Sequence, residues 1–270
     1  MHEIKIQTVK NGHPREQTFH LPENWNEMNY HYITTFCYVM NLNIPDKEIR
    51  KTILYRWMKI KPNQFFKMRT GDLEELYPLL DFLFSKEIDS GKLMMPMFQY
   101  NWRSFYGPGN DFCFLTVAEF AVAEMLMQKY AKERNAKDLN KMVSVLYRKA
   151  NKDTFIDYKD TGSDPRTPFS DKMLDRLGAI ISPIPLWYKQ AALYNFIAFH
   201  TYVNKKYEFL YDTDTKPKAG NMGWAGVMHS LAGPELGTME DVERMPFLNA
   251  MIILTKLHFE RKRLEESLKP

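Results

Sequence analysis

The stretch LWYKQAALYNFIAFHTYVNKKYEF, residues 186–209, carries eight Phe, Tyr or Trp side chains within a 270-residue sequence. Its apolar residues fall on most sides of a helix, and a helix of this kind is stable only when it is buried. We therefore expect residues 186–209 to form the central helix of the second half of the chain. Pro183 and Pro185 predict that a preceding helix, capped by Ser170, ends near Ile181.

Helical periodicity also marks the chain before this stretch, where apolar residues recur three or four positions apart. Thr116 and Glu119 have the spacing of a capping box, which predicts a helix start there. Pro78 lies inside one of the periodic segments and could kink it. The predicted helices cover residues 26–41, a segment that opens at Pro45-Asp46, and residues 72–84, 116–133 and 138–148.

The first twenty residues have a different period. Ile4 and Ile6 alternate with polar side chains, and Asn11-Gly12 separates this run from a second alternating run. An Asn-Gly pair between two such runs predicts a β-hairpin. Residues 85–112 lose all periodicity and are rich in Gly, Pro and aromatic side chains, so we expect an ordered loop that can hold a short strand.

A long polar connection divides the sequence. Residues 150–169 are predominantly polar, and a connection of this length is uncommon within a compact domain. We predict an N-terminal lobe at 1–149, a linker loop at 150–169 and a C-terminal lobe at 170–270. The predicted fold class is mainly α, a multi-helical two-lobed bundle with a small N-terminal β-hairpin.

The composition of the chain indicates which classes of binding partner to expect. The net charge is +4, from 37 basic and 33 acidic residues, and no basic stripe of the kind that binds nucleic acid is visible. No apolar run approaches the roughly 20 residues that span a bilayer, and the N-terminal residues lack a signal-peptide core. We expect a soluble protein of the bacterial cytoplasm, with no membrane and no specific nucleic acid as partner, and with Cys37 and Cys113 as buried free thiols.

Catalytic and metal-binding patterns are weak. The seven His lack the i, i+4 spacing of a helical zinc site, although His229 and His258 could meet in space. The acidic run Asp157, Asp160 and Asp164 does not have the alternating ligands of a calcium loop. Asp212 and Asp214 resemble a turn more than a metal site, and Gly107-Pro-Gly lacks the following Lys of a phosphate loop. The sequence therefore predicts no enzyme, no metal and no cofactor.

The region after the aromatic stretch predicts a module that packs against another surface. NMGWAGVMHSLAG (221–233) and MEDVERMPFLNAMIIL (239–254) read as three short helices with apolar faces, separated by Gly and Pro. Methionine suits adaptable contact surfaces, but it also fills irregular cores. If this module binds a partner, the expected contact residues are Trp224, Met228, Met239, Met245, Phe247 and Met251; if it does not, the same residues are core.

Several segments together carry a resemblance. They are LPENWNEM (21–28), YGPGNDF (106–112), LTVAEFAVAE (115–124), DLNKMVSVLYR (138–148) and the C-terminal segment that ends in VERMPFLNA (242–250). The set resembles uncharacterised proteins from phages and prophages of Bacteroidetes. The C-terminal segment is also similar to the end of phage tail-assembly chaperones, most of which are smaller than this chain.

The resemblance implies a non-enzymatic phage assembly protein, similar to a tail-assembly chaperone, that binds a tail or other virion protein through apolar helical surfaces and can form an oligomer. One alternative is a structural virion component, such as a connector or tail accessory protein. Another is a metal-dependent enzyme that uses the acidic loop or the C-terminal histidines.

Overall fold

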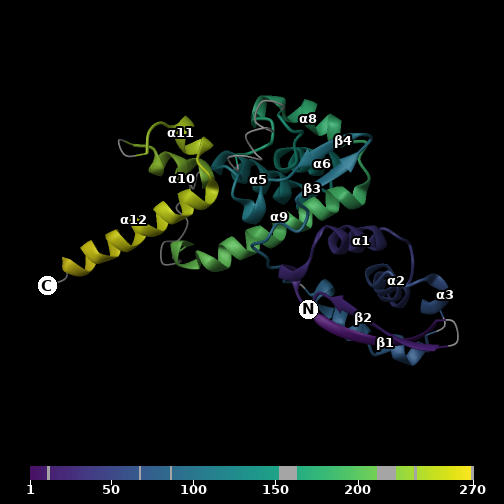
Figure 1. Ribbon diagram of the computed structural model, residues 1–270. Helices are drawn as coiled ribbons and strands as arrows, with labels where there is room; N and C mark the ends of the chain where they lie inside the picture. Colours follow the sequence, from purple (N-terminus) through teal and green to yellow (C-terminus); the bar gives the residue numbers. More distant parts are fainter. Residues whose placement is uncertain are drawn as a thin grey trace.

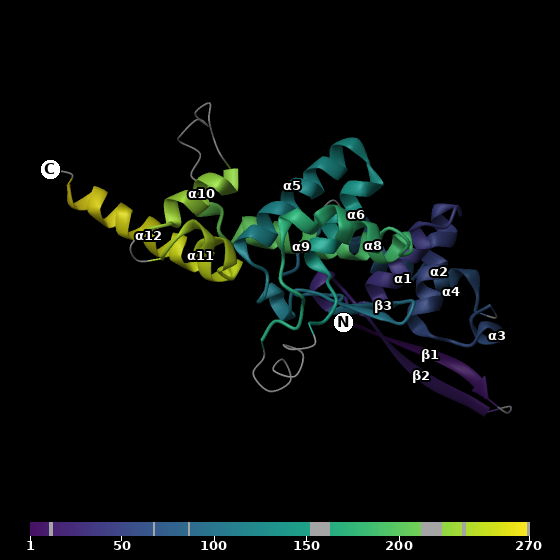
Figure 2. The ribbon, with the colours of Figure 1, turned by 90° about the horizontal axis from the view of Figure 1, so that it is seen from above.

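A central helix, α9 (Leu186–Lys206), runs through the structure and the other helices lie around it (Figure 1). The computed structural model is mainly helical with an N-terminal β-hairpin, which confirms the predicted fold class. Its two views show the hairpin and the C-terminal helix at opposite ends of the molecule (Figures 1 and 2). The structure describes residues 1–10, 13–66, 68–85, 87–151, 163–211, 223–233 and 236–268.

The N-terminal hairpin pairs β1 (His2–Lys10) with β2 (His13–Leu21) in antiparallel register, as predicted. Residues 11 and 12, at the predicted turn, lie outside the described part. The hairpin is joined to the helices by the Tyr32 hydroxyl, which donates to the carbonyl oxygen of His20 at 2.9 Å. Leu21 is fully buried, so the end of the second strand belongs to the core.

The helix predicted for residues 26–41 is divided into a 3-10 turn, η1 (Trp25–Glu27), and α1 (Tyr30–Met40). The division occurs at Asn29, whose side chain accepts hydrogen bonds from two backbone N–H groups of the first turn of α1. A side chain that satisfies these otherwise unpaired donors sets the helix start. The next helix, α2 (Asp46–Met58), opens after Pro45 as predicted.

The single helix predicted for residues 72–84 is wrong. The structure has the short helices α3 (Pro62–Phe65) and α4 (Thr70–Glu74), followed by the 3-10 helix η2 (Tyr77–Phe84). Pro78 lies in the first turn of η2, where its missing N–H leaves no hydrogen bond unmade. The proline therefore starts a new helix and does not kink a continuous one.

The segment predicted as a loop with a short strand contains a second hairpin, β3 (Met97–Tyr100) with β4 (Arg103–Tyr106). The turn η3 (Asn110–Phe112) follows, after Gly109 at φ +80°. A side chain at Gly109 would lie 2.5 Å from Phe114, so this position requires glycine.

The two cysteines differ in burial. Cys37 is buried and free, as predicted. Cys113 is exposed, next to the buried Phe112, so the predicted burial of Cys113 is wrong.

The capping box predicted at Thr116 is present and begins α5 (Val117–Glu133). The helix predicted for residues 138–148 is α6 (Ala136–Leu146), which begins earlier because Asn135 caps it. Ser170 makes no capping hydrogen bond; it precedes the 3-10 turn η4 (Asp171–Met173), which leads into α8 (Leu174–Ile181). The predicted helix 186–209 ends at Lys206, and η5 (Glu208–Tyr211) follows it.

Aromatic contacts join α9 to both of its neighbouring layers. On one side, Tyr194 stacks on Trp25 with centroids 5.8 Å apart and meets the ring of Phe36 edge-on at 5.5 Å. On the other side, Phe199 stacks on Phe112 at 4.0 Å. The buried side chains on both sides of the predicted linker form one continuous cluster. The division into lobes at 150–169 stays a prediction that rests on the polarity of this segment.

A buried ion cluster connects α5, the end of α6 and the last residues of the predicted linker, 163–169. Glu119 accepts from Arg148 at 2.5 Å and from Arg166 at 3.0 Å, and Arg166 also pairs with Asp164 at 2.8 Å. The side chains of Glu119 and both arginines are at most 2% exposed. Glu119 and Asp164 thus together balance the charges of the two buried arginines, and Glu119 joins both of them to α5.

We expect Glu119→Gln to destabilise the protein by about 3–5 kcal/mol, because removing one member of a buried ion pair leaves the other charges uncompensated. The measurement is the free energy of unfolding in urea. Glu240→Gln is the matched control, since it breaks an exposed pair with Arg244 and should change that free energy by less than about 0.5 kcal/mol. Equal stabilities of the two variants would contradict this role for Glu119.

Candidate partner-binding site at the C-terminal end

The C-terminal region contains three helices, as predicted: α10 (Gly223–Leu231), α11 (Met239–Arg244) and α12 (Phe247–Ser267). A capping box between Thr238 and Asp241 starts α11. Met245 ends α11, and Pro246 precedes the first turn of α12, where a proline has no hydrogen bond to lose. Local sequence therefore sets the start of both helices.

The beginning of α12 is anchored on α5. The Phe247 N–H donates to the Leu115 carbonyl at 2.7 Å, and the Val117 N–H donates to the Met245 carbonyl at 3.0 Å. The Phe247 ring stacks on that of Phe120 with centroids 3.9 Å apart and planes 11° apart. Phe247 is completely buried, so the first turn of α12 belongs to the core.

A polar network holds α10 against the same core. Glu124 accepts from the indole N–H of Trp224 at 2.5 Å, and its other oxygen lies 2.8 Å from Nε2 of His200. Asn204 lies 3.1 Å from Nδ1 of the same histidine. Burial raises the pKa of Glu124, but the hydrogen bonds from His200 and Trp224 outweigh it, and the net pKa is below the ordinary value of 4.5. The carboxylate form is thus the one that anchors α10.

The residues predicted to contact a partner lie largely inside this region. Phe247 and Met251 are buried, with exposed fractions of 0% and 1%, while Trp224, Met228, Met239 and Met245 are partly buried. Several of them cover a small second core that contains Val117 and Val242. Met251 and Phe247 are packing residues in this structure, because no partner could reach them without displacing α12. Partner binding by the set stays a prediction.

The apolar surface that a partner could reach lies further along α12. This surface, termed here the α12 face, consists of exposed large side chains beyond the anchored first turn. Their exposed fractions range from 44% to 81%. In Figure 1 the helix, drawn in yellow, extends away from the rest of the protein toward the C-terminus. The α12 face comprises Leu257, Leu264 and Leu268, which lie on one side of the helix, whereas Ile252 and Phe259 are exposed on another side.

The sequence signal for this face is a leucine spacing and not a cluster of methionines. Phe247, Ala250, Leu254 and Leu257 follow the three-and-four spacing of a heptad seam, and Leu264 and Leu268 continue it after Arg261, which occupies the intervening seam position. The first residues of the seam, Phe247 and Ala250, are buried, whereas Leu264, further along the helix, is exposed. The same stripe that packs α12 on the body therefore continues onto a part of the helix that the body does not cover.

Exposed charged residues accompany the α12 face. Lys256 and Glu260 form an i, i+4 pair at 3.8 Å, and Arg261 and Glu265 form another at 2.8 Å. Such pairs stabilise an exposed helix by a few tenths of a kcal/mol each. Together with the anchored first turn, they allow the projecting part to stay helical without a partner.

The other candidate chemistry of the sequence concerns its histidine and acidic side chains. Within the described residues, no group of three or more His, Cys, Asp or Glu could hold a metal ion. The His258 ring lies against Phe209, with centroids 5.5 Å apart, and His229 is exposed. The predicted acidic residues at 157, 160, 212 and 214 lie outside the described residues. No helix in the described ranges is long and apolar enough to cross a membrane.

Comparisons with family models, with curated proteins and with solved structures give no match. The geometry of the site combines an anchored helix base, an exposed apolar stripe and a mixed-charge polar face. This combination can bind another protein surface.

Glu124→Gln should weaken the anchoring of α10, because hydrogen bonds to a charged group contribute about 1.5–3 kcal/mol. The pKa of Glu124 is lowered by folding, so its contribution is present above the ordinary carboxyl range and disappears as the pH falls through the folded-state pKa. The difference in unfolding free energy between wild type and variant should therefore be largest near neutral pH and should shrink below about pH 4. A constant difference from pH 7 to pH 3 would refute this account.

Substitutions along α12 should distinguish packing from contact residues. Met251→Ala should cost about 2–5 kcal/mol in unfolding free energy, because it leaves a cavity in the core. Leu264→Ala, at an exposed position of the same helix, should change it by less than about 0.5 kcal/mol. Thermal and urea unfolding measure both effects, and a large loss for Leu264→Ala would show that the α12 face is already covered.

Proposed function

We propose that this protein is a non-enzymatic phage assembly protein, similar to tail-assembly chaperones, that binds a tail or other virion protein through the α12 face. Two independent features support the proposal. One is the resemblance of its sequence segments to phage proteins. The other, which carries the proposal, is the heptad seam of α12 that leaves the core and continues exposed.

The physical basis is helix recognition. An amphipathic helix binds when its apolar stripe enters a groove on a partner, with anchors at i, i+3, i+4 and i+7. Leu257 and Leu264 are one heptad apart and both exposed. Burying a side chain of this size contributes about 1.5–3 kcal/mol, so a few such anchors can support a specific but reversible complex. Reversibility is what an assembly factor needs, because it must release its client.

The methionine-rich helices α10 and α11 have a supporting role in this proposal. They pack against α5 and the base of α12 and so position the projecting helix. Partly exposed side chains such as Met228 and Met239 lie near this base and can extend the contact area. Methionine suits such a margin because its flexible side chain adapts to the shape of the surface that it meets.

The test is co-purification with tail and capsid proteins of the phage that encodes the chain. The double variant Leu257→Ser, Leu264→Ser should lose the partner, with affinity reduced at least tenfold. Lys256→Ser, Arg263→Ser is the matched control, because these positions have the same spacing one residue earlier and are exposed and polar. Partner binding that survives the leucine substitutions would exclude the α12 face.

Analysis of finished particles separates the two assembly roles. A chaperone leaves before the particle is complete, so it should be present in assembly intermediates and absent from purified virions. A connector or tail accessory protein stays at a fixed copy number. Finding the chain in virions at a fixed ratio to the tail proteins would favour the structural role over the chaperone role.

A further inference from the structure

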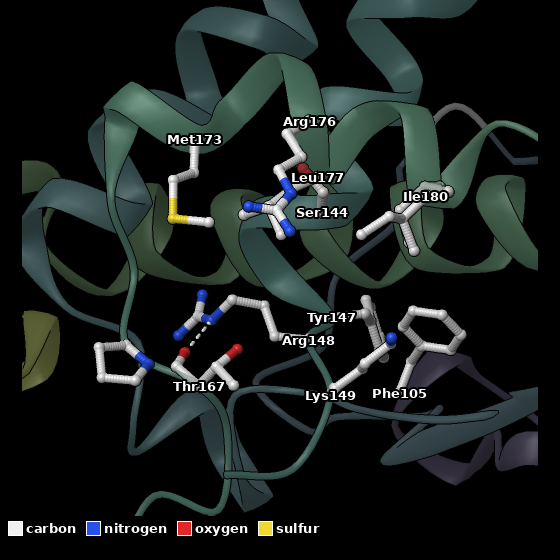
Figure 3. A pocket seen from close by; sticks show the side chains of 12 residues that line it. Phe105, Ser144, Tyr147, Arg148, Lys149, Thr167, Met173, Arg176, Leu177 and Ile180 are labelled. Carbon is white, nitrogen blue, oxygen red and sulfur yellow. Dashed lines mark hydrogen bonds between the residues drawn. The ribbon is translucent and has the colours of Figure 1, made fainter.

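A pocket of about 420 Å³ lies between the end of α6 and the segment that contains η4 and α8 (Figure 3). One wall is formed by the side chains of Met173, Leu177 and Ile180, which project from η4 and α8. Phe105 and Tyr147 lie on the opposite side. Its volume is in the range of pockets that bind small organic ligands, and most of its lining is apolar.

Three basic residues lie around this apolar space. Arg148 is buried and fixed, because its Nε donates to the Thr167 carbonyl at 2.6 Å and its Nη2 donates to Glu119. Arg176 and Lys149 are exposed and also line the pocket. Figure 3 shows the guanidinium groups of Arg176 and Arg148 on opposite sides of the same space.

Within the part of the chain that the structure describes, no carboxylate neutralises Arg176 or Lys149. No Asp or Glu is among the lining residues, and within the described chain neither basic group takes part in an ion pair. Asp175, the acidic residue next to Arg176 in sequence, pairs with Lys141 at 2.6 Å. Arg148 differs from them, because Glu119 compensates its charge. Among the described residues that line the pocket, Arg176 and Lys149 are thus exposed cations without an ion-pair partner, whereas Arg148 is a buried cation held in place by its hydrogen bonds.

We infer that this pocket binds a small anionic ligand with an apolar body, such as a medium-chain carboxylate. The apolar body would lie against Met173, Leu177 and Ile180, and the carboxylate would meet Arg176, with Lys149 adding charge. A guanidinium donates two parallel hydrogen bonds to a carboxylate, which makes arginine well suited to such a head group. The inference is independent of the proposed partner-binding function, since the pocket and the α12 face share no residue.

The test is isothermal titration calorimetry with sodium decanoate as the probe. Wild type should bind decanoate measurably more tightly than decanol, which has the same chain but no charge. Arg176→Gln should weaken decanoate binding about tenfold, or about 1.4 kcal/mol, because it removes the charged donor that meets the carboxylate, and should leave decanol binding unchanged.

Two control variants locate the effect. Lys172→Gln removes an exposed charge from η4 that does not line the pocket, and it should leave decanoate affinity unchanged. Leu264→Ser should also leave it unchanged, because this variant alters only the α12 face. Absence of decanoate binding, equal affinity for decanol, or equal losses in Arg176→Gln and Lys172→Gln would each overturn the inference.

Discussion

The helix α9 has apolar and aromatic side chains on most of its circumference, and no single neighbouring helix can cover such a surface. The chain meets this constraint by placing a layer on each side. Tyr194 meets Trp25 and Phe36 from the N-terminal region, and Phe199 meets Phe112 ahead of α5. Each layer is held in place by the helix that it covers, so residues on either side of the polar 150–169 segment share one core.

The C-terminal helices pack against the same core, but only part of their apolar surface is buried there. Phe247 stacks on Phe120, and Trp224 donates to Glu124, so α10 and the first turn of α12 are fixed from α5. The next turns still contact the body, through buried Met251 and through Phe209, which lies against His258 and Phe259, and the apolar seam of α12 continues past these contacts to Leu264. The proposed partner-binding surface follows from this geometry, because a helix longer than the surface that it packs on leaves its remaining apolar side chains exposed.

The charged residues show two solutions to the cost of burial. Glu119, together with Asp164, compensates Arg148 and Arg166 inside the protein, where uncompensated charge would be strongly destabilising. Arg176 and Lys149 stay at the surface, where water solvates them, but they border an apolar pocket. The buried cluster stabilises the segment around Thr167 that forms part of this pocket. One set of charges therefore builds the structure, and the other gives the pocket its electrostatic preference.

Local patterns in the sequence were sufficient for the helical class, the N-terminal hairpin, the capping box at Thr116, the central aromatic helix and the three C-terminal helices, because each depends on residues a few positions apart. The structure around Pro78, the pairing of Glu119 with Arg166 and the burial of Met251 depend on contacts between distant segments. A methionine has the same apolar character on a contact surface as in a core, so the amino-acid sequence alone could not show which of these two places Met251 occupies. Only the packing of α12 on α5 decided that Met251 is buried and Leu264 is exposed.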